Sequence, residues 1–327
     1  MSLGENVVVT LFGESHGLAV GALIEGMPAN TELNVDQLMN DMISRRPGSG
    51  LASKRKETDE VEILSGVHNG KTTGMPILLL IRNKDVRSKD YSFLPYQPRP
   101  GHVDHPISVK SDGAADLRGG GSFSARLTAG LVAASSISRV AIPEDWKIEA
   151  TVGALGGLEG EEGIALAEKA RKAGDSLGSR VDLVISGLPV GLGEPWFDGI
   201  EPVLSRALMA IPAARAVEFG RGVDAGFMRG SEHNDVWGKD MSLSEGADGA
   251  LGGMASGAPI SVRITFKPPS GISLPQETFN QVTGLMEELA IEGRHDPVIA
   301  PRARPVVEAV ARLVILDLGI QGGYIDG

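Results

Sequence analysis

Two histidines stand in loops that could carry proton-transfer chemistry. His16 follows Ser15 and precedes Gly17, and His102 follows Gly101 in the segment Arg99 to Asp104. A histidine beside a glycine fits poorly into the apolar stripe of a helix or strand, so the remaining alternative is an ordinary surface-loop histidine. Imidazole changes its charge near neutral pH and suits general acid and base catalysis. His16 and His102 are therefore candidate catalytic residues.

Arginines gather around the same part of the chain. Arg45, Arg46, Arg118 and Arg126 carry guanidinium groups, which bind phosphates and carboxylates in bidentate fashion. From Arg45 to Arg126 there are fourteen Lys or Arg residues and nine Asp or Glu residues, in a chain whose net charge is −11. This local excess fits a site for a small anion, although a solvated basic face would show the same charge. His295 and Asp296 form a third polar loop.

Composition excludes several classes of function. With 327 residues and 42% hydrophobic content, the chain can build a sizeable core and is not disordered. Its negative charge disfavours nucleic acid or an anionic membrane as a partner. The absence of cysteine excludes disulfides, thiolate catalysis and zinc ribbons. The N-terminus has no basic region of the kind that opens a signal peptide, and no apolar run approaches the ~20 residues of a membrane span, so we expect a cytoplasmic protein.

Strands and helices must position these loops. In the first half the pattern predicts strands at Asn6–Phe12 and Leu18–Glu25, a helix at Asn34–Arg46, and a strand pair at Val61–Ser65 and Met75–Asn83. A long polar loop, Lys84–Asp116, follows. Three glycines then precede Ser122–Ala141, which is almost uncharged and is expected to be a helix buried on most sides.

The second half repeats this pattern loosely, and no linker separates the halves, so we expect a single domain over residues 1–327. The predicted strands are Trp146–Val152, Val181–Gly187, Ala216–Gly220 and Ile260–Lys267, and the predicted helices are Gly163–Ala173, Pro202–Ile211, Gln276–Ile291 and Pro305–Leu318.

Two short motifs suggest other enzymes. Gly13–Gly17 fits the G-x-S-x-G elbow of a serine hydrolase, with Ser15 as nucleophile, but that elbow requires a helix where Leu18–Glu25 alternates like a strand. Gly66–Thr72 resembles a phosphate-binding P-loop but has one residue too few between its glycines. The hydrolase stays as the alternative, and labelling of Ser15 by an organophosphonate would favour it.

Longer motifs point to one family. Taken together and in order, they resemble those of chorismate synthases from end to end of the chain. The motifs are FGESHG (12–17), RRPG (45–48), EVEILSGV with GKTTGMPI (60–77), RPGHVD (99–104), DLRGGGSFSAR (116–126), VEFGRG (217–222), GSEHND (230–235), FKP (266–268) and GRHDPVIAPRARPVVEA (293–309).

The resemblance implies an activity and a fold. Chorismate synthases convert 5-enolpyruvylshikimate 3-phosphate into chorismate and phosphate by an anti 1,4-elimination, the last common step of the shikimate pathway to aromatic amino acids, and they need reduced FMN. Some members also carry a flavin reductase activity linked to NADP. No separate nicotinamide domain is visible here, so we expect an external flavin reductant. The implied fold is an α+β sandwich of central helices between antiparallel sheets with internal pseudo-symmetry, assembled as a homotetramer.

The resemblance also assigns roles to residues. His16 would protonate the leaving phosphate, His102 would protonate the reduced flavin, and Asp296 would lie near the flavin N5. Arg45, Arg46, Arg118 and Arg126 would bind substrate. A non-catalytic anion-binding relative would lack such acid–base residues. The flavin contacts would be Ser122, Ser124, Pro212, Ala213, Gly252, Lys267, Pro268, Pro269, Ser270, Gly271 and Arg294.

Three of these contact regions depart from the family's common residues. The family commonly has Arg-Ser-Ser at 122–124, Asn-Ala at 212–213, and Ser-Asn or Ser-Ser at 255–256, where this chain has Ser-Phe-Ser, Pro-Ala and Ala-Ser.

Overall fold

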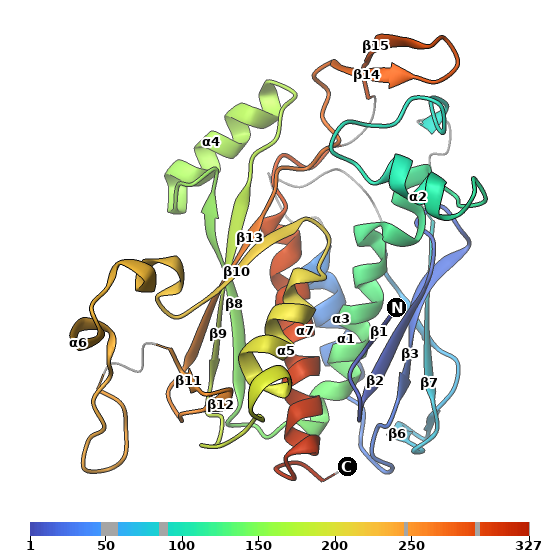
Figure 1. The fold of residues 1–327 in the computed structure, drawn as a ribbon. Helices are drawn as coiled ribbons and strands as arrows, with labels where there is room; N and C mark the ends of the chain where they lie inside the picture. The colour runs from blue at the N-terminus through green and yellow to red at the C-terminus, as the bar shows by residue number, and fades with distance from the viewer. Residues whose placement is uncertain (47–57, 85–90, 245–247, 292–294, 327) are drawn as a thin grey trace.

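Two antiparallel sheets enclose a layer of helices in the computed structural model, which describes residues 1–46, 58–84, 91–244, 248–291 and 295–326 (Figure 1). The first sheet has the order β1-β2-β3-β7-β4 and the second the order β8-β9-β13-β10. These strands are β1 (Ser2–Leu3), β2 (Val8–Gly13), β3 (Ala19–Glu25), β4 (Val61–Ile63), β7 (Ile77–Arg82), β8 (Lys147–Leu155), β9 (Ser179–Ser186), β10 (Ala214–Phe219) and β13 (Ile260–Phe266).

Four helices fill the space between the sheets: α1 (Val35–Arg45), α3 (Thr128–Ser138), α5 (Ile200–Met209) and α7 (Ala300–Gln321) (Figure 1). The helices α3 and α7 pack against each other, and α1 and α5 flank them. One cluster of buried apolar side chains runs from the first sheet through these helices to the second. The expected α+β sandwich is confirmed, whereas the expectation of a single domain stays a prediction.

The two halves share one topology, which explains the loose repeat in the sequence. Apart from α4 (Gly160–Lys172), which lies between β8 and β9, and several short elements, each half runs strand, strand, helix, strand, strand, helix: β2, β3, α1, β4, β7, α3 in the first, and β8, β9, α5, β10, β13, α7 in the second. The matching strands also occupy matching places, because the sheet orders β2-β3-β7-β4 and β8-β9-β13-β10 correspond one to one. Helix α3, with its glycine-rich approach, therefore corresponds to α7, which follows the loop of His295 and Asp296.

Small residues let α3 sit directly on the first sheet. A Cβ atom at Gly130 would lie 2.7 Å from the carbonyl oxygen of Gly21, so only glycine permits this approach of helix to strand. The helix is buried on nearly every side, as its uncharged sequence predicts. Its regular part begins at Thr128, later than predicted, because residues 118–127 form short 3₁₀ turns interrupted by the positive-φ glycines 119–121 and by the extended Ser124.

The N-terminal turn is fastened to the last helix. The carboxylate of Asp317 in α7 accepts hydrogen bonds from the backbone N–H groups of Glu5, Asn6 and Val7, at 2.9, 2.7 and 2.9 Å. Residues more than 300 positions apart in the chain thus meet at one side chain.

One predicted element is wrong. Residues 276–291 form a hairpin of β14 (Gln276–Asn280) and β15 (Leu285–Leu289) instead of a helix. The apolar residues Phe279, Val282, Leu285 and Met286 have helical spacing, but all four are exposed, so no core exists to favour a helix. Gly284, whose φ is +72°, lies in the turn of the hairpin.

Further elements lie outside the repeated pattern. The predicted loop 84–116 contains the helix α2. The elements not yet named are α2 (Asp104–Lys110), α6 (Gly230–His233), β5 (Val67–His68), β6 (Lys71–Thr72), β11 (Ala250–Leu251) and β12 (Met254–Ala255).

Candidate active site

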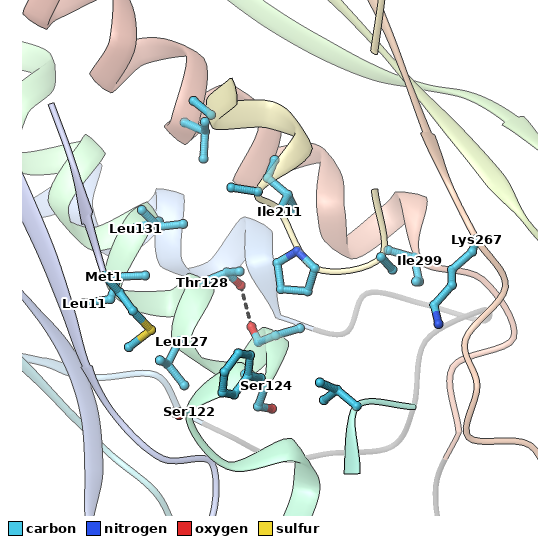
Figure 2. A pocket seen from close by; sticks show the side chains of 18 of the residues that line it. Met1, Leu11, Ser122, Ser124, Leu127, Thr128, Leu131, Ile211, Lys267 and Ile299 are labelled. Carbon is cyan, nitrogen blue, oxygen red and sulfur yellow. Dashed lines mark hydrogen bonds between the residues drawn. The ribbon is translucent and has the colours of Figure 1, made fainter. Parts of the chain in front are cut away.

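A cavity of about 800 Å³ opens where α3 begins and α5 ends (Figure 2). Aliphatic side chains line much of it: Leu11, Leu127 and Leu131 from the first half and Ile211 and Ile299 from the second. Most of the residues predicted to bind flavin lie on this wall, and His102 lies there too. They are Ser122, Ser124, Pro212, Ala213, Lys267, Pro268, Pro269 and Ser270.

A run of three left-handed glycines separates the two candidate histidines. Gly119, Gly120 and Gly121 have φ values of +59°, +85° and +53°, which L-residues with side chains adopt only under strain. A Cβ at Gly119 would lie 3.0 Å from His16 Nε2, and a Cβ at Gly120 would lie 3.6 Å from His102 Nε2. The structure thus brings both histidines to one glycine loop at the edge of the cavity.

His102 is held by a buried carboxylate. Its Nδ1 lies 2.7 Å from Oδ1 of Asp104. The Arg99 guanidinium donates to both oxygens of this carboxylate, to Oδ1 at 2.6 Å and to Oδ2 at 2.8 Å. Burial alone would raise the pKa of the Asp104 carboxyl, but the hydrogen bonds from Arg99 and His102 outweigh it and hold that pKa well below its ordinary value. An ionised carboxylate only accepts, so the contact with Asp104 favours the tautomer in which Nδ1 of His102 donates and Nε2 is left for chemistry; Nη2 of Arg99 also lies 3.0 Å from this Nδ1.

His16 lies between an aromatic ring and an exposed ion pair. The Tyr91 ring contacts it edge-on. Arg118 donates to Asp116 at 2.7 and 2.8 Å, which lowers the pKa of the Asp116 carboxyl, and the charge of His16 contributes less to that shift. The Arg118 side chain is 42% exposed, so it can reach a ligand.

Arg45 and Arg126 turn away from the cavity toward a buried aspartate. Both guanidinium groups pair with Asp59, Arg45 at 3.0 Å, and all three side chains are under 10% exposed. Burial, and then the charge of Arg302, lowers the pKa of Arg45 to about 9. Burial opposes the charge of Asp59, but Arg45 and Arg126 outweigh it and lower the pKa of the carboxyl. Arg45 also donates to Thr128 in the first turn of α3, so this cluster braces α1 against α3.

Arg46 and Asp296 occupy two further positions near this cluster. Arg46 donates to the backbone oxygen of Thr58, while its Nε is buried with no hydrogen-bond partner among the described residues. Asp296 pairs with Arg302 of α7 at 2.8 Å.

Three predicted flavin contacts do not line the cavity. Gly271 directly follows the lining residue Ser270. Gly252 lies in the turn between β11 and β12, beside Gly253, whose oxygen accepts from Ile200 at the start of α5, whereas the cavity lies at the end of α5. Arg294 lies outside the described residues.

Sequence reasoning missed several residues at the site. They are Asp59, Tyr91, Arg99, Asp104, Arg206 and Arg215. Arg99 and Asp104, the charged neighbours of His102, could have been predicted from the sequence, because both lie with His102 in the six-residue segment 99–104. Nothing local marks Asp59 or Tyr91, because their partners lie far away in the chain.

The serine hydrolase alternative does not fit the structure. Ser15 is followed by strand β3 rather than a helix, and its hydroxyl donates to the Arg118 backbone oxygen at 3.0 Å. Within the described ranges, no group of three or more His, Asp or Glu residues could hold a metal ion. The same ranges contain no helix long and apolar enough to span a membrane.

Comparisons with known proteins agree over the whole chain. A model of the family described as chorismate synthase matches residues 7–320. Curated relatives named chorismate synthase include one from Aeropyrum pernix, 44% identical over 97% of this chain and 92% of its own length, and one from Thermococcus kodakarensis, 42% identical over 96% of each. A crystal structure of a chorismate synthase superposes with a TM-score of 0.73 at 26% identity, covering 98% of this chain and 93% of that one.

Proposed function

The chain belongs to the chorismate synthase family, and on that premise we propose that it converts 5-enolpyruvylshikimate 3-phosphate into chorismate and phosphate, as a carbon–oxygen lyase that uses reduced FMN. One observation carries the proposal from the geometry. His16 and His102, from two separate loops, both approach the glycine run Gly119–Gly121, and Gly119 and His102 line the cavity that collects most of the predicted flavin contacts.

The cavity suits FMN. Its volume falls in the usual range for cofactor sites, about 300–1,000 Å³, and its aliphatic walls suit a flat aromatic ring. Ser122 and Ser124 supply hydroxyls, and Lys267 and Arg215 supply positive charge for a phosphate. When bound and reduced, FMN would supply an electron-rich ring that can act as the base for the C6 proton of the substrate.

Arginines bind the anionic substrate in this proposal. Arg46 has a buried Nε with no hydrogen-bond partner among residues the structure describes, and Arg118 is half exposed, so both can donate to a phosphate or carboxylate. Arg45 and Arg126 are also proposed as substrate-binding residues. Their guanidinium groups pair with Asp59, so in this proposal they act on the substrate through their positive electrostatic potential.

The histidines and Asp296 handle protons. His16 holds a proton beside the glycine loop and transfers it to the departing phosphate. His102 holds a proton at Nε2, and Asp104 fixes its ring by accepting from Nδ1. Asp296, which precedes α7 and pairs with Arg302, would lie near the flavin N5 and help that atom accept the C6 proton of the substrate. Each of these assignments is part of the proposal.

The decisive experiment is an anaerobic assay with photoreduced FMN and 5-enolpyruvylshikimate 3-phosphate. We expect chorismate absorbance and phosphate release in equal amounts, and no product with oxidised FMN alone. His16→Ala should abolish turnover, while His68→Ala, which removes an exposed histidine in β5, serves as the matched control. Absence of chorismate from the wild-type protein under these conditions would refute the proposal.

We further propose a homotetramer that depends on an external flavin reductant. Light scattering during size-exclusion chromatography measures the mass of the assembly. Aerobic turnover with NADPH and FMN, in the absence of any added reductase, would contradict the need for an external reductant.

A further inference from the structure

Two cations meet where strands β10 and β13 reach the cavity. Lys267 directly follows the last residue of β13, and Arg215 is the second residue of β10. Ala214 pairs with Phe266 across these antiparallel strands, and the backbone N–H of Lys267 donates to the Ala213 oxygen at 3.0 Å. Both side chains line the cavity, and Figure 2 shows the ammonium of Lys267 directed into it.

A β-bulge gives Arg215 its position. Ala214 is opposite Phe266 and Ala216 is opposite Thr265, so Arg215 is the extra residue between two consecutive pairs. Such a bulge redirects a side chain, and bulges are common beside active sites. Ala213, two residues before Arg215, has a φ of +72°, a strained value for a residue with a side chain. The backbone is thus distorted at the place where Arg215 turns to the cavity.

Neither cation has an acidic partner in the part of the chain that the structure describes. Lys267 donates to the Gly101 oxygen at 2.5 Å, and Arg215 donates to the Ala214 oxygen at 2.9 Å. Among the described residues, no carboxylate lies within ion-pair distance of either group, although arginines such as Arg99 and Arg180 have such partners. Burial, and then the charge of Arg215, lowers the pKa of Lys267. Two like charges side by side favour a bound anion.

We infer that Arg215 binds the phosphate group of the flavin together with Lys267 and makes the cavity selective for FMN over riboflavin. The guanidinium fork donates two parallel hydrogen bonds to a phosphate, and the ammonium adds a point charge. The inference rests on the proposed function for the identity of the ligand, and it deepens that function by assigning a specificity residue.

The test compares two ligands that differ only in the phosphate. FMN and riboflavin are titrated calorimetrically into wild type and Arg215→Gln. In the variant we expect FMN to bind about tenfold more weakly and riboflavin to bind as before. Arg215→Lys should recover part of the difference. Equal weakening for both flavins, or no preference for FMN in the wild type, would overturn the inference.

A control variant distinguishes an effect of Arg215 itself from the effect of removing any positive charge from the cavity wall. Arg206→Gln removes a cation from another part of the same cavity wall and should preserve the preference for FMN. If it erases that preference as fully as Arg215→Gln, the general field of the cavity explains the selectivity and Arg215 has no special role. Shikimate 3-phosphate is titrated as well, because a loss confined to this ligand would assign Arg215 to substrate and overturn the inference.

For variants that bind flavin too weakly for calorimetry, the thermal midpoint is measured with inorganic phosphate instead. Inorganic phosphate should raise the thermal midpoint of wild type more than that of Arg215→Gln, and equal shifts would count against a phosphate site at Arg215. None of these readouts involves turnover. Failure of the proposed enzymatic function therefore appears only in the chorismate assay, and failure of this inference appears only in the binding data.

Discussion

The ring of Tyr91 stands edge-on to the imidazole of His16, with centroids 4.9 Å apart and planes at 89°. The guanidinium of Arg99 lies 5.3 Å from the centroid of the same Tyr91 ring. Arg99 in turn pairs with Asp104, the carboxylate that holds His102. A single tyrosine thus connects the surroundings of both candidate catalytic histidines.

Tyr91→Leu should therefore impair catalysis although Tyr91 itself transfers no proton. Loss of the edge contact and of the cation–π contact, each worth about 1 kcal/mol, frees His16 and the Arg99 loop. We expect kcat to fall about tenfold, whereas Tyr91→Phe should stay near wild type because the ring remains. Steady-state assays of both variants distinguish a role of the Tyr91 ring from a role of its hydroxyl group. Loss of activity in Tyr91→Phe would implicate the hydroxyl group.

His102→Ala should slow turnover far more than it weakens substrate binding. General acid catalysis commonly contributes about 10²- to 10⁴-fold, and the His102 ring lies at a cavity wall rather than in the core. The measurement is kcat with photoreduced FMN, together with a substrate titration. Unchanged turnover would remove His102 from the mechanism.

Asp104→Asn should reduce stability in a pH-dependent manner. Because the folded-state pKa of Asp104 is depressed, its ionised form stabilises the fold above about pH 4, the ordinary value for aspartate. That contribution is lost as the pH falls further, through the folded-state pKa. Chemical denaturation at pH 7 should show a loss of about 3 kcal/mol, since Arg99 stays buried without its partner. The gap to wild type should narrow below pH 4, and a gap independent of pH would argue against an ionised Asp104.

Arg45 and Arg46 are adjacent in the chain but should behave differently. Arg45→Ala breaks a buried ion pair with Asp59 and should cost about 3 kcal/mol of the free energy of unfolding. Arg46→Ala should leave the thermal midpoint close to wild type and raise the dissociation constant of substrate at least about tenfold. Normal substrate binding by Arg46→Ala would contradict a role in substrate binding and would leave Arg46 as a charge at the end of α1.

Flavin and substrate should each strengthen the binding of the other. Gly101 and His102 line the cavity, and so does Gly119, which approaches His16, so the ligand that binds second meets loops already ordered by the first. Thermodynamic linkage requires the coupling to be equal in both directions. Calorimetric titration of FMN, with and without 5-enolpyruvylshikimate 3-phosphate, measures it. Identical flavin affinity in the two titrations would mean that the sites are independent.

The sequence predicted most elements of the sandwich because hydrophobic periodicity reports burial. The uncharged stretch after Gly119–Gly121 did form the buried helix α3. The same signal failed at residues 276–289, where helically spaced apolar residues lie on an exposed hairpin and bury no face. Periodicity also carries no information on strand order, so the matching topology of the two sheets became visible only in three dimensions.

Residues of the candidate site that stand in short sequence motifs were predicted, whereas residues whose partners lie far away in the chain were missed. His102 and Lys267 stood in short motifs, and both line the cavity. Asp59, which pairs with Arg45 and Arg126 from 14 and 67 positions away, gives no signal in its own neighbourhood. The bulge that turns Arg215 depends on pairing with a strand some fifty residues later, which the residues around it do not reveal.

The hydrogen bonds from the backbone of Glu5–Val7 to the Asp317 carboxylate have a consequence for folding during synthesis. A ribosome adds about 5–20 residues per second, so the N-terminal turn waits roughly 15–60 s before helix α7 is synthesised. During that interval the first sheet and α3 lack the helix that covers α3 in the finished core. Their apolar faces remain open to chaperones or to neighbouring nascent chains. Completion of the core is therefore among the last events of synthesis, however early the N-terminal strands pair.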